Sequence, residues 1–367
     1  MFKVFDSGLS PIGIDIGSHA VRLMQFRTTA GGLSLQAACR IELDSLDAGG
    51  QASARQVTAI RHAISTQNFS GRDVVVSLPT NSVHAKSVRL PQMPDSDLDQ
   101  ALKWEAKDRF GFEIGESGGQ IVWFRAGEVR RGTEVKDELL LFAVEGGVLT
   151  GIMQELLGLR LNVRAVDLAP CATFRSVRRA AGAGTTPVLA GTGALLDIGH
   201  AGTQFMITRD EELVFYKHID LGGKAVNEAI AAKLGITAAE AVQMRARLTT
   251  DAANADEAPL NQALRDAMRA PLEELARELD MCMRYYVVTF RGARPESIVA
   301  TGRQAGCAQV RETLGNALNL QVEEAQPLRG VQNLGDVARP DRSSEWAIAA
   351  GLSLYPLHAR ARVEAAA

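Results

Sequence analysis

The sequence contains the tripeptide Asp-Ile-Gly twice, each time at the end of an apolar run. The first copy begins at Asp15 and the second, 182 positions later, at Asp197. A methionine follows each aspartate by nine residues, at Met24 and Met206. Because the second copy starts about half-way along the 367-residue chain, the pattern predicts two similar units and a duplicated architecture.

The chemistry that these turns offer is anion binding. Backbone N–H groups in a tight turn form a nest for phosphate oxygens, and Gly17 and Gly199 lack the Cβ that would keep a ligand from the backbone. An aspartate beside phosphate would be repelled without a cation, and Mg2+ binds one or two carboxylates together with phosphates. The repeat therefore predicts two facing hairpins that hold a polyphosphate and its Mg2+. Ordinary Asp-x-Gly turns are the alternative, which recurrence at half-chain spacing disfavours.

Composition excludes several other classes of protein. The 40 Lys and Arg residues against 43 Asp and Glu give a net charge of -3, without a basic block that would attract nucleic acid. The four cysteines are scattered and form no C-x-x-C pair, which predicts buried thiols rather than a metal site. The sequence shows neither a signal peptide nor a run of about 18 apolar residues. We therefore expect a cytoplasmic protein without a membrane span.

Hydrophobic periodicity predicts alternating strands and helices, with a domain boundary in the Gly-, Ala- and Thr-rich stretch 181–193. We expect a first lobe at 1–190 and a second at 191–367. The longest helical pattern, 260–288, contains Pro271, which predicts a kink or the start of a new helix. Each lobe would begin near one of the two Asp-Ile-Gly hairpins.

A further helix follows the sequence Leu-Pro-Gln-Met-Pro, and Asp95 or Ser96 can cap its N-terminus. After it, two strands are expected around a charged turn at 130–138. For three aromatic residues in and just after the helix, core packing is favoured over a partner-binding surface. These residues are Trp104, Phe110 and Phe112.

Three motifs resemble, in order, those of the ATPase superfamily of actin, Hsp70 and the sugar kinases. "IGIDIGSHAVRL" and "LLDIGHAGTQF" are similar to its two phosphate motifs, and "SIVATGRQAG" is similar to its adenosine motif. The segment "VVVSLPTNSVHAKSVRLPQMPDSDLDQALKWEAKDRF" and the closing helix "EWAIAAGLSLYP" resemble the PilM family of type IV pilus assembly proteins, cytoplasmic relatives of the cell-division protein FtsA. The resemblance implies an α/β, actin-like (ribonuclease H-like) duplicated two-lobe fold. It also implies an FtsA-like inserted subdomain at about 72–165 and a helical subdomain at about 224–290.

The resemblance further implies a site for ATP and Mg2+, with Asp15 and Asp197 as the metal-binding residues. Arg22 keeps the positive charge that a lysine commonly supplies in the family, and Arg303 stands where the adenosine motif usually has a second glycine. The residues expected to contact the nucleotide are Asp15, Gly17, Ser18, His19, Arg22, Asp197, Gly199, Gly202, Thr203, Gly223, Lys224, Glu228, Gly302 and Arg303. For Lys224 and Glu228, a solvated i, i+4 ion pair is the alternative.

The function implied by the resemblance is a nucleotide-dependent scaffold of the type IV pilus inner-membrane assembly complex. Such a scaffold binds the cytoplasmic N-terminal segment of a PilN-like membrane protein in a groove beside the inserted subdomain, and contacts other pilus assembly proteins. The alternatives are a sugar or small-molecule kinase of the same superfamily and a filament-forming cytoskeletal protein. A kinase needs an Asp poised as base toward an acceptor hydroxyl, and residues 70–165 show no acidic signature of that kind. We expect at most a weak ATPase, and contacts for self-association cannot be recognised in the sequence.

Overall fold

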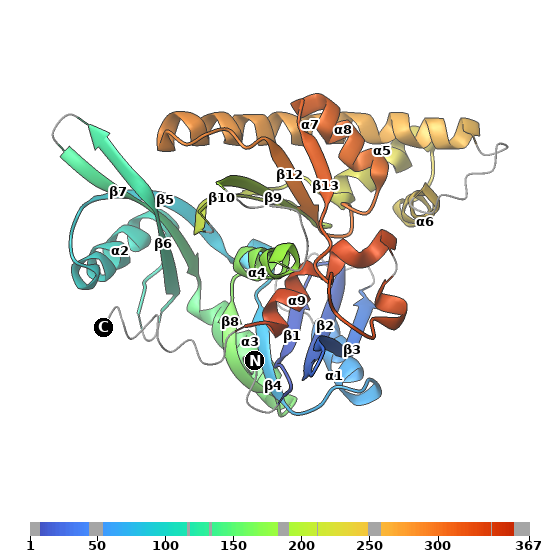
Figure 1. Ribbon diagram of the computed structural model, residues 1–367, viewed down its shortest axis with the longest axis horizontal. Helices are drawn as coiled ribbons and strands as arrows, with labels where there is room; N and C mark the ends of the chain where they lie inside the picture. Colours follow the sequence, from blue (N-terminus) through green and yellow to red (C-terminus); the bar gives the residue numbers. More distant parts are fainter. Residues whose placement is uncertain are drawn as a thin grey trace. The chain divides into compact units, whose positions relative to one another are not determined.

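The computed structural model describes residues 8–43, 54–115, 118–131, 134–182, 191–210, 212–248, 258–338 and 340–355. The chain divides into two compact units (Figure 1). Unit 1 comprises the chain up to Ser176, residues 330–335 and the residues from Ile348 onward. Unit 2 comprises Val177–Arg329 and Asp336–Ala347. Among the described residues, no helix has the length and apolar character needed to cross a membrane.

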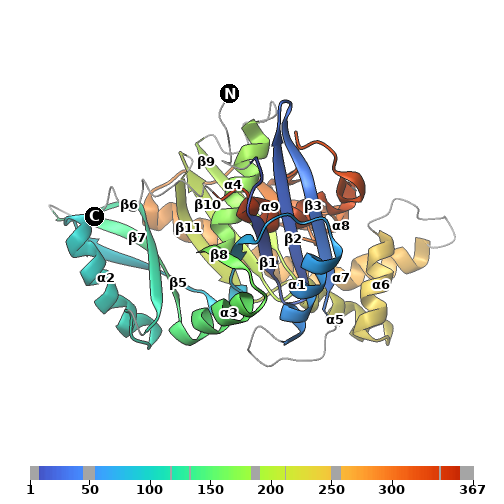
Figure 2. The ribbon, with the colours of Figure 1, turned by 90° about the horizontal axis from the view of Figure 1, so that it is seen from below.

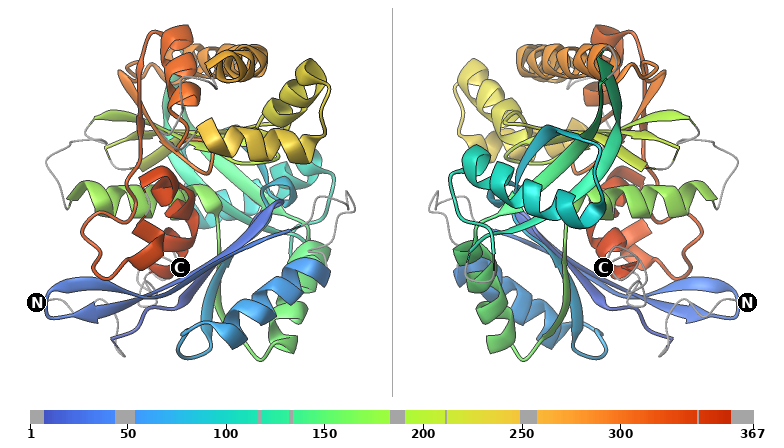
Figure 3. Two further views of the ribbon diagram at one scale, coloured as in Figure 1. Left: turned by 90° about the vertical axis from the view of Figure 1, so that its right-hand side faces the viewer. Right: turned by 90° about the vertical axis from the view of Figure 1, so that its left-hand side faces the viewer.

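Unit 1 is built on a five-stranded sheet of order β3-β2-β1-β4-β8. Its first three strands are antiparallel, with β2 and β3 forming the long blue hairpin of Figures 2 and 3, whereas β4 and β8 run parallel to β1. Even-numbered residues such as Ile14 and Val76 pack with α1 and α3, and Val75 packs with α4 and α9 on the other face. The strands and helices are β1 (Ile12–Ile16), β2 (Ala20–Thr29), β3 (Gly32–Glu42), β4 (Asp73–Ser77), β8 (Asn162–Asp167), α1 (Ala54–Thr66), α3 (Gly146–Gly158), α4 (Ala169–Gly182) and α9 (Ala347–Ser353).

Residues 348–355 belong to unit 1, a different division from the lobes expected from sequence. The reason is that α9 packs directly on β1, where a Cβ on Gly13 would lie 2.5 Å from Ser353 N and 2.9 Å from Leu352 Cβ. The hydroxyl groups of Ser10 and Ser353 also share a hydrogen bond of 2.6 Å. A glycine in the first strand thus makes room for a helix more than 300 residues later.

Unit 2 repeats the sheet of unit 1 strand for strand, in the order β11-β10-β9-β12-β13. Here again the first three strands in sequence are antiparallel and the next two are parallel to the first. This match confirms the duplicated α/β architecture predicted from the repeat. The strands and helices are β9 (Thr192–Ile198), β10 (Thr203–Arg209), β11 (Glu212–Ile219), β12 (Ser297–Thr301), β13 (Gln321–Glu324), α5 (Gly223–Leu234), α6 (Ala238–Leu248), α7 (Ala258–Phe290) and α8 (Ala308–Leu318).

Pro271 lies inside α7, which continues as one helix of 33 residues (Figure 1). The expectation that a new helix starts at Pro271 is therefore wrong. A proline in a helix interior costs about 3 kcal/mol. Leu272, Leu275 and Leu279 beside it are nearly fully buried, and their packing outweighs that cost.

An inserted subdomain of unit 1 has its own sheet, of order β5-β7-β6, and its own core. Leu98 and Leu102 of the covering helix α2 pack against Leu139 and Leu141 of the central strand. The elements are β5 (His84–Pro91), α2 (Asp95–Phe110), β6 (Gln120–Arg131) and β7 (Glu134–Val144). The range 72–165 expected for this insert also includes β4 and most of β8, which belong to the main sheet.

The charged segments of the insert depart from the sequence prediction. The N-cap of α2 is Pro94, without a side-chain cap, and Asp95 instead accepts a hydrogen bond from Arg125 at 3.1 Å. The charged turn expected at 130–138 is mostly strand, because β6 continues to Arg131 and β7 begins at Glu134. The two residues between these strands lie outside the described range.

The three aromatic residues in and just after α2 differ in their burial. Phe110 and Phe112 are half-buried with ring centroids 6.0 Å apart, in line with the packing expected for them. Trp104 is 75% exposed, so the expectation of core packing is wrong for this residue. The buried stripe of α2 is formed by Leu98 and Leu102, and Trp104 lies outside it.

Candidate functional site

The first Asp-Ile-Gly stretch places Asp15 in a row of polar residues across the sheet of unit 1. Asp15 is 5% exposed and lies opposite Arg22 of β2, whose Nη1 donates to Asp15 Oδ2 at 3.2 Å. On its other side Asp15 pairs with Ser77, the last residue of β4, and Ser77 pairs with Asp167 at the end of β8. Within the described part of the chain, the fully buried Ser77 hydroxyl has no hydrogen-bond partner. The row lies at the carboxyl ends of parallel strands, the edge at which open α/β sheets bind ligands.

The second stretch repeats this arrangement in unit 2. Asp197 is 6% exposed, lies opposite Gln204 of β10 and pairs with Thr301, the last residue of β12. Gln204 Nε2 donates to Asp197 Oδ2 at 3.2 Å, and Thr301 Oγ1 donates to Oδ1 at 2.9 Å. Tyr216 donates to Gln204 Oε1 at 3.2 Å, and burial, with Asp197 nearby, raises the pKa of the phenol. Both oxygens of Asp197 therefore accept hydrogen bonds from neutral groups.

The two rows match position by position but differ in charge. The residue seven places after the aspartate is Arg22 in unit 1 and Gln204 in unit 2, and each lies directly opposite its aspartate. The guanidinium of Arg22 offsets the charge of Asp15, whereas Gln204 and Thr301 are neutral donors that orient the Asp197 carboxylate. Arg22 thus adds a positive charge at the first turn that its counterpart Gln204 does not supply at the second.

Glycines set the turns that follow both aspartates. The Gly17 N–H donates to Ala20 O at 3.2 Å, and the Gly199 N–H donates to Gly202 O at 3.0 Å. A Cβ would lie 2.7 Å from Ala20 O at the first position and 2.9 Å from Gly202 O at the second. The two turns therefore share one backbone hydrogen bond and one requirement for glycine.

The polar side chains of the turns lie in different surroundings. Ser18 is exposed and His19 is half-buried in the first turn. In the second, Thr203 is fully buried, and its hydroxyl donates to Leu221 O at 2.6 Å. Thr203 therefore fixes the backbone of its own unit.

The N-terminus of α5 is bound to the second turn. The Gly223 N–H donates to Gly199 O at 2.9 Å, and the Lys224 N–H donates to His200 O at 2.8 Å. The side chains of Lys224 and Glu228 are 64% and 60% exposed, with Nζ and Oε1 3.8 Å apart. This is the geometry of the solvated i, i+4 pair.

The third motif holds Gly302 in a backbone conformation that other residues rarely adopt. Its φ is +85°, and a Cβ would lie 2.5 Å from Ile198 O and 2.9 Å from Asp197 Oδ1. The Gly302 N–H donates to Ser344 O at 3.1 Å. The backbone of this motif therefore comes directly against the Asp197 carboxylate.

The residues after Gly302 fill space beside α5 and α6. Arg303 is half-buried. Gln304 accepts a hydrogen bond from Arg245 of α6, which also donates to Asn227 Oδ1 at 2.8 Å. Burial lowers the pKa of Arg245 to about 10. The turn is thus tied to two helices through a buried guanidinium.

We expect Gly302→Ala to lower the free energy of unfolding by about 2–4 kcal/mol, because a left-handed conformation and a close contact add together. Gly235→Ala is the matched control, since Gly235 has φ +66° but no atom within 4 Å of a Cβ. The control loses only about 1 kcal/mol. Urea unfolding of both variants measures the difference. Equal losses of unfolding free energy in the two variants would show that Ile198 and Asp197 can shift to make room for the added Cβ.

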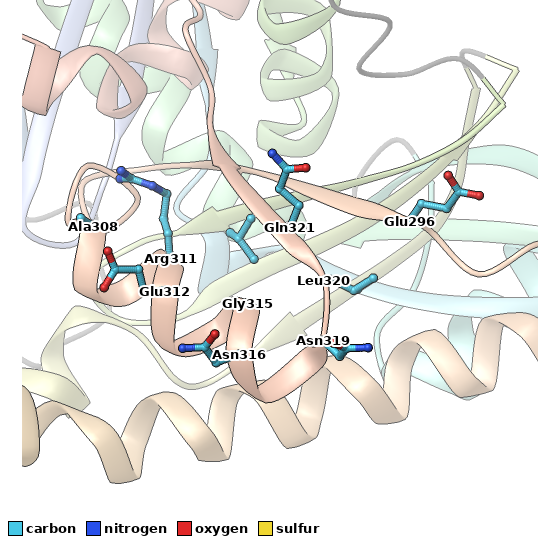
Figure 4. Close-up of a pocket in the computed structure, with 10 residues that line it drawn as sticks. Glu296, Ala308, Arg311, Glu312, Gly315, Asn316, Asn319, Leu320 and Gln321 are labelled. Atoms are coloured by element: carbon cyan, nitrogen blue, oxygen red, sulfur yellow. The ribbon is translucent and has the colours of Figure 1, made fainter.

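Outside the proposed site, unit 2 has a surface hollow of about 570 Å³ between α8 and β13 (Figure 4). Arg311, at one side of the hollow, donates to Glu324 at 3.4 Å. None of the residues expected to contact a nucleotide lines it. No group of three or more His, Cys, Asp or Glu residues that could hold a metal occurs in the described ranges.

A model of the family "Type IV pilus assembly protein PilM" matches residues 13–356. The chain belongs to the PilM family. The matched range includes both aspartate rows, the inserted subdomain and the Gly302 turn. No curated protein matches the sequence.

Solved structures similar to this PilM-family chain have the same fold. A chain of a "PilM-PilN type IV pilus biogenesis complex" gives a TM-score of 0.77 at 20% identity, over 95% of this chain and 98% of that one. The ethanolamine utilization protein EutJ from Carboxydothermus hydrogenoformans gives 0.57 at 11% identity, over 96% and 94%. MreB5 of Spiroplasma citri, bound to AMPPNP, gives 0.52 at 9% identity, over 97% and 98%. These likenesses confirm the actin-like α/β fold predicted from the sequence.

Several residues of the two rows were not predicted from the sequence as site residues. Ser77 and Thr301 each end a parallel strand, far in sequence from the aspartate that they flank. Gln204 could not be recognised from the sequence as the counterpart of Arg22, because the two side chains differ in chemistry. The only local signals for these two residues are the Leu-Pro pair directly after Ser77 and the glycine directly after Thr301, each of which marks the end of a strand.

Proposed function

We propose that this PilM-family protein is an ATP-binding scaffold of type IV pilus assembly, held beside the inner membrane by the N-terminal peptide of a PilN-like membrane protein. The observation that supports nucleotide binding is the repeated row, in which a buried aspartate and a glycine turn occupy the same register in both units. Calorimetry with ATP in the presence and absence of Mg2+ tests this proposal. A chain that binds ATP in neither condition would contradict it.

The turns of the two units offer different groups to a nucleotide. In unit 2, Asp197 would hold Mg2+, which would offset the negative charge of the phosphates, because Mg2+ takes few protein ligands and is commonly held by one or two carboxylates. Arg22, oriented by Asp15, donates to phosphate oxygens. The buried Ser77 hydroxyl, without a partner in the described chain, supplies a further donor at the same edge of the sheet.

The remaining residues of the proposed site shape the turns or border the nucleotide. Gly17, Gly199 and Gly302 keep the backbone open to close approach. The others are Ser18, His19, Gly202, Thr203, Gly223, Lys224, Glu228 and Arg303. Supporting evidence comes from one protein of this fold, MreB5, which was solved with AMPPNP.

The PilN-like peptide binds at the inserted subdomain. One similar structure is of a PilM-PilN complex, which supports this partner. In the insert, β6 is an edge strand of 12 residues, and its Val122 is 50% exposed. An extended peptide adds to such an edge through main-chain hydrogen bonds, and its side chains supply specificity. Other pilus assembly proteins would then be recruited to the same chain.

We expect ATP hydrolysis slower than about 1 per second, below the usual range of enzyme turnover. The reason is that Asp15 is engaged by Arg22, and Asp197 accepts two hydrogen bonds, so neither is placed as a general base. Phosphate release with Mg-ATP measures the rate, and the Asp197→Asn variant gives the background rate of release. Rapid transfer of phosphate to a sugar would instead favour a kinase.

A further inference from the structure

The exposed face of α7 carries an apolar stripe. Met281, Tyr285 and Val288 recur at helical spacing and are 51%, 48% and 79% exposed. This spacing puts the three side chains on one face of the helix. The opposite face, with Leu279 and Met283, is fully buried in unit 2. Large apolar side chains are thus exposed along a helix whose other side already supplies the core.

Charged residues surround this stripe in an uneven order. Exposed Glu273 and Glu274 precede it, whereas exposed Arg291 and Arg294 follow it. Arg277 is the one exposed basic residue between the two glutamates and the stripe. An apolar centre within a charged rim is the usual anatomy of a protein interface. Exposed Arg284 lies beside the stripe, and both Arg284 and Arg294 pair with Asp280. The N-terminal side of the stripe nevertheless carries more acidic side chains and the C-terminal side more basic ones.

We propose that the α7 stripe is a contact between two copies of this chain, packed antiparallel about a two-fold axis near residue 283. A two-fold contact uses the same patch on both copies, so the patch must complement itself. With this axis, Met281 of each copy lies against Tyr285 of the other. Antiparallel packing also brings the acidic end of one stripe beside the basic end of the other, whereas parallel packing would bring like charges together.

The size of the stripe sets the strength of this association. One helix face supplies a few hundred Å² per copy, less than the roughly 800 Å² of a stable interface. The dimer is therefore weak and depends on concentration. Figure 1 shows α7 as one long helix beside the unit 2 sheet.

Sedimentation velocity of the full chain, over roughly a hundredfold range of concentration, tests the proposal. The wild-type chain will show reversible dimerisation, and Val288→Glu will raise the dimer dissociation constant at least about tenfold. Because Val288 is 79% exposed, this variant keeps its fold, which circular dichroism verifies. Leu157→Glu, at a 57% exposed position on α3, is the matched control and leaves dimerisation unchanged.

Charge reversal tests the antiparallel register. Glu273→Arg and Arg291→Glu will each weaken the dimer, and the two changes together will restore it. A wild-type chain that stays monomeric overturns the proposal and assigns the stripe to a different protein. A dimer unaffected by Val288→Glu, or a double variant that is weaker than both single variants, also overturns it.

Discussion

Asp197→Asn will weaken Mg-ATP binding by about 100-fold, whereas Asp15→Asn will weaken it by about tenfold, a difference of about 1.4 kcal/mol. The aspartates occupy equivalent positions, so this unequal effect comes from their neighbours. Asp197 accepts hydrogen bonds from the neutral groups of Gln204 and Thr301, and it is the carboxylate that we propose to hold Mg2+. Asp15 is paired with Arg22, so we propose that its loss acts mainly by changing the position of that guanidinium.

Titration calorimetry with and without Mg2+ measures both effects. In the absence of Mg2+, Asp197→Asn will bind ATP no more weakly than the wild-type chain, because the lost carboxylate no longer has a cation to bind. Asp220→Asn is the matched control, since the Asp220 side chain is 98% exposed in the same unit. Unchanged affinity in both aspartate variants would remove the repeat from nucleotide binding. A larger loss in Asp15→Asn would contradict the assignment of Mg2+ to Asp197.

The repeated hairpins could be predicted from sequence because their contacts are local. In each one, the aspartate, the glycine turn and the opposing residue lie within a few positions of one another, so a short pattern determines all three. Ser77 and Thr301 could not be predicted in the same way. Their place beside the aspartates depends on the register of parallel strands that join the sheet after long connections.

Errors in the sequence prediction also have physical causes. Pro271 lowers helix propensity locally, but α7 is held by buried leucines on either side of it. Trp104 is apolar, but the buried face of α2 is set by the spacing of Leu98 and Leu102, which excludes it. In both cases the local structure was determined by the position of the residue relative to the core, and not by its chemical type.

Removal of the insert will abolish binding of the PilN-like peptide and recovery of the chain with membranes, while ATP binding stays within about threefold of wild type. Residues 84–143 can be replaced by a short Gly-Ser linker. His84 and Ala143 are paired across antiparallel strands, so their Cα atoms are about 5 Å apart. The replacement leaves Val83 and Val144, which belong to the core of the main sheet, in place. Deletion of the whole range 72–165 would instead remove β4 and most of β8 from that sheet.

A single substitution separates loss of a docking edge from loss of the whole subdomain. Val122→Arg places a charge on the exposed side of β6 without touching the insert core, which contains Leu98, Leu102 and Leu139. We expect it to weaken binding of a synthetic N-terminal PilN peptide about tenfold, because an apolar anchor loses its contact while the main-chain hydrogen bonds remain. Fluorescence anisotropy measures this, with Val242→Arg on α6 as the matched exposed control. If the insert-free chain still binds the peptide, the PilN-like partner docks elsewhere. If it loses binding but Val122→Arg does not, another face of the insert holds the peptide.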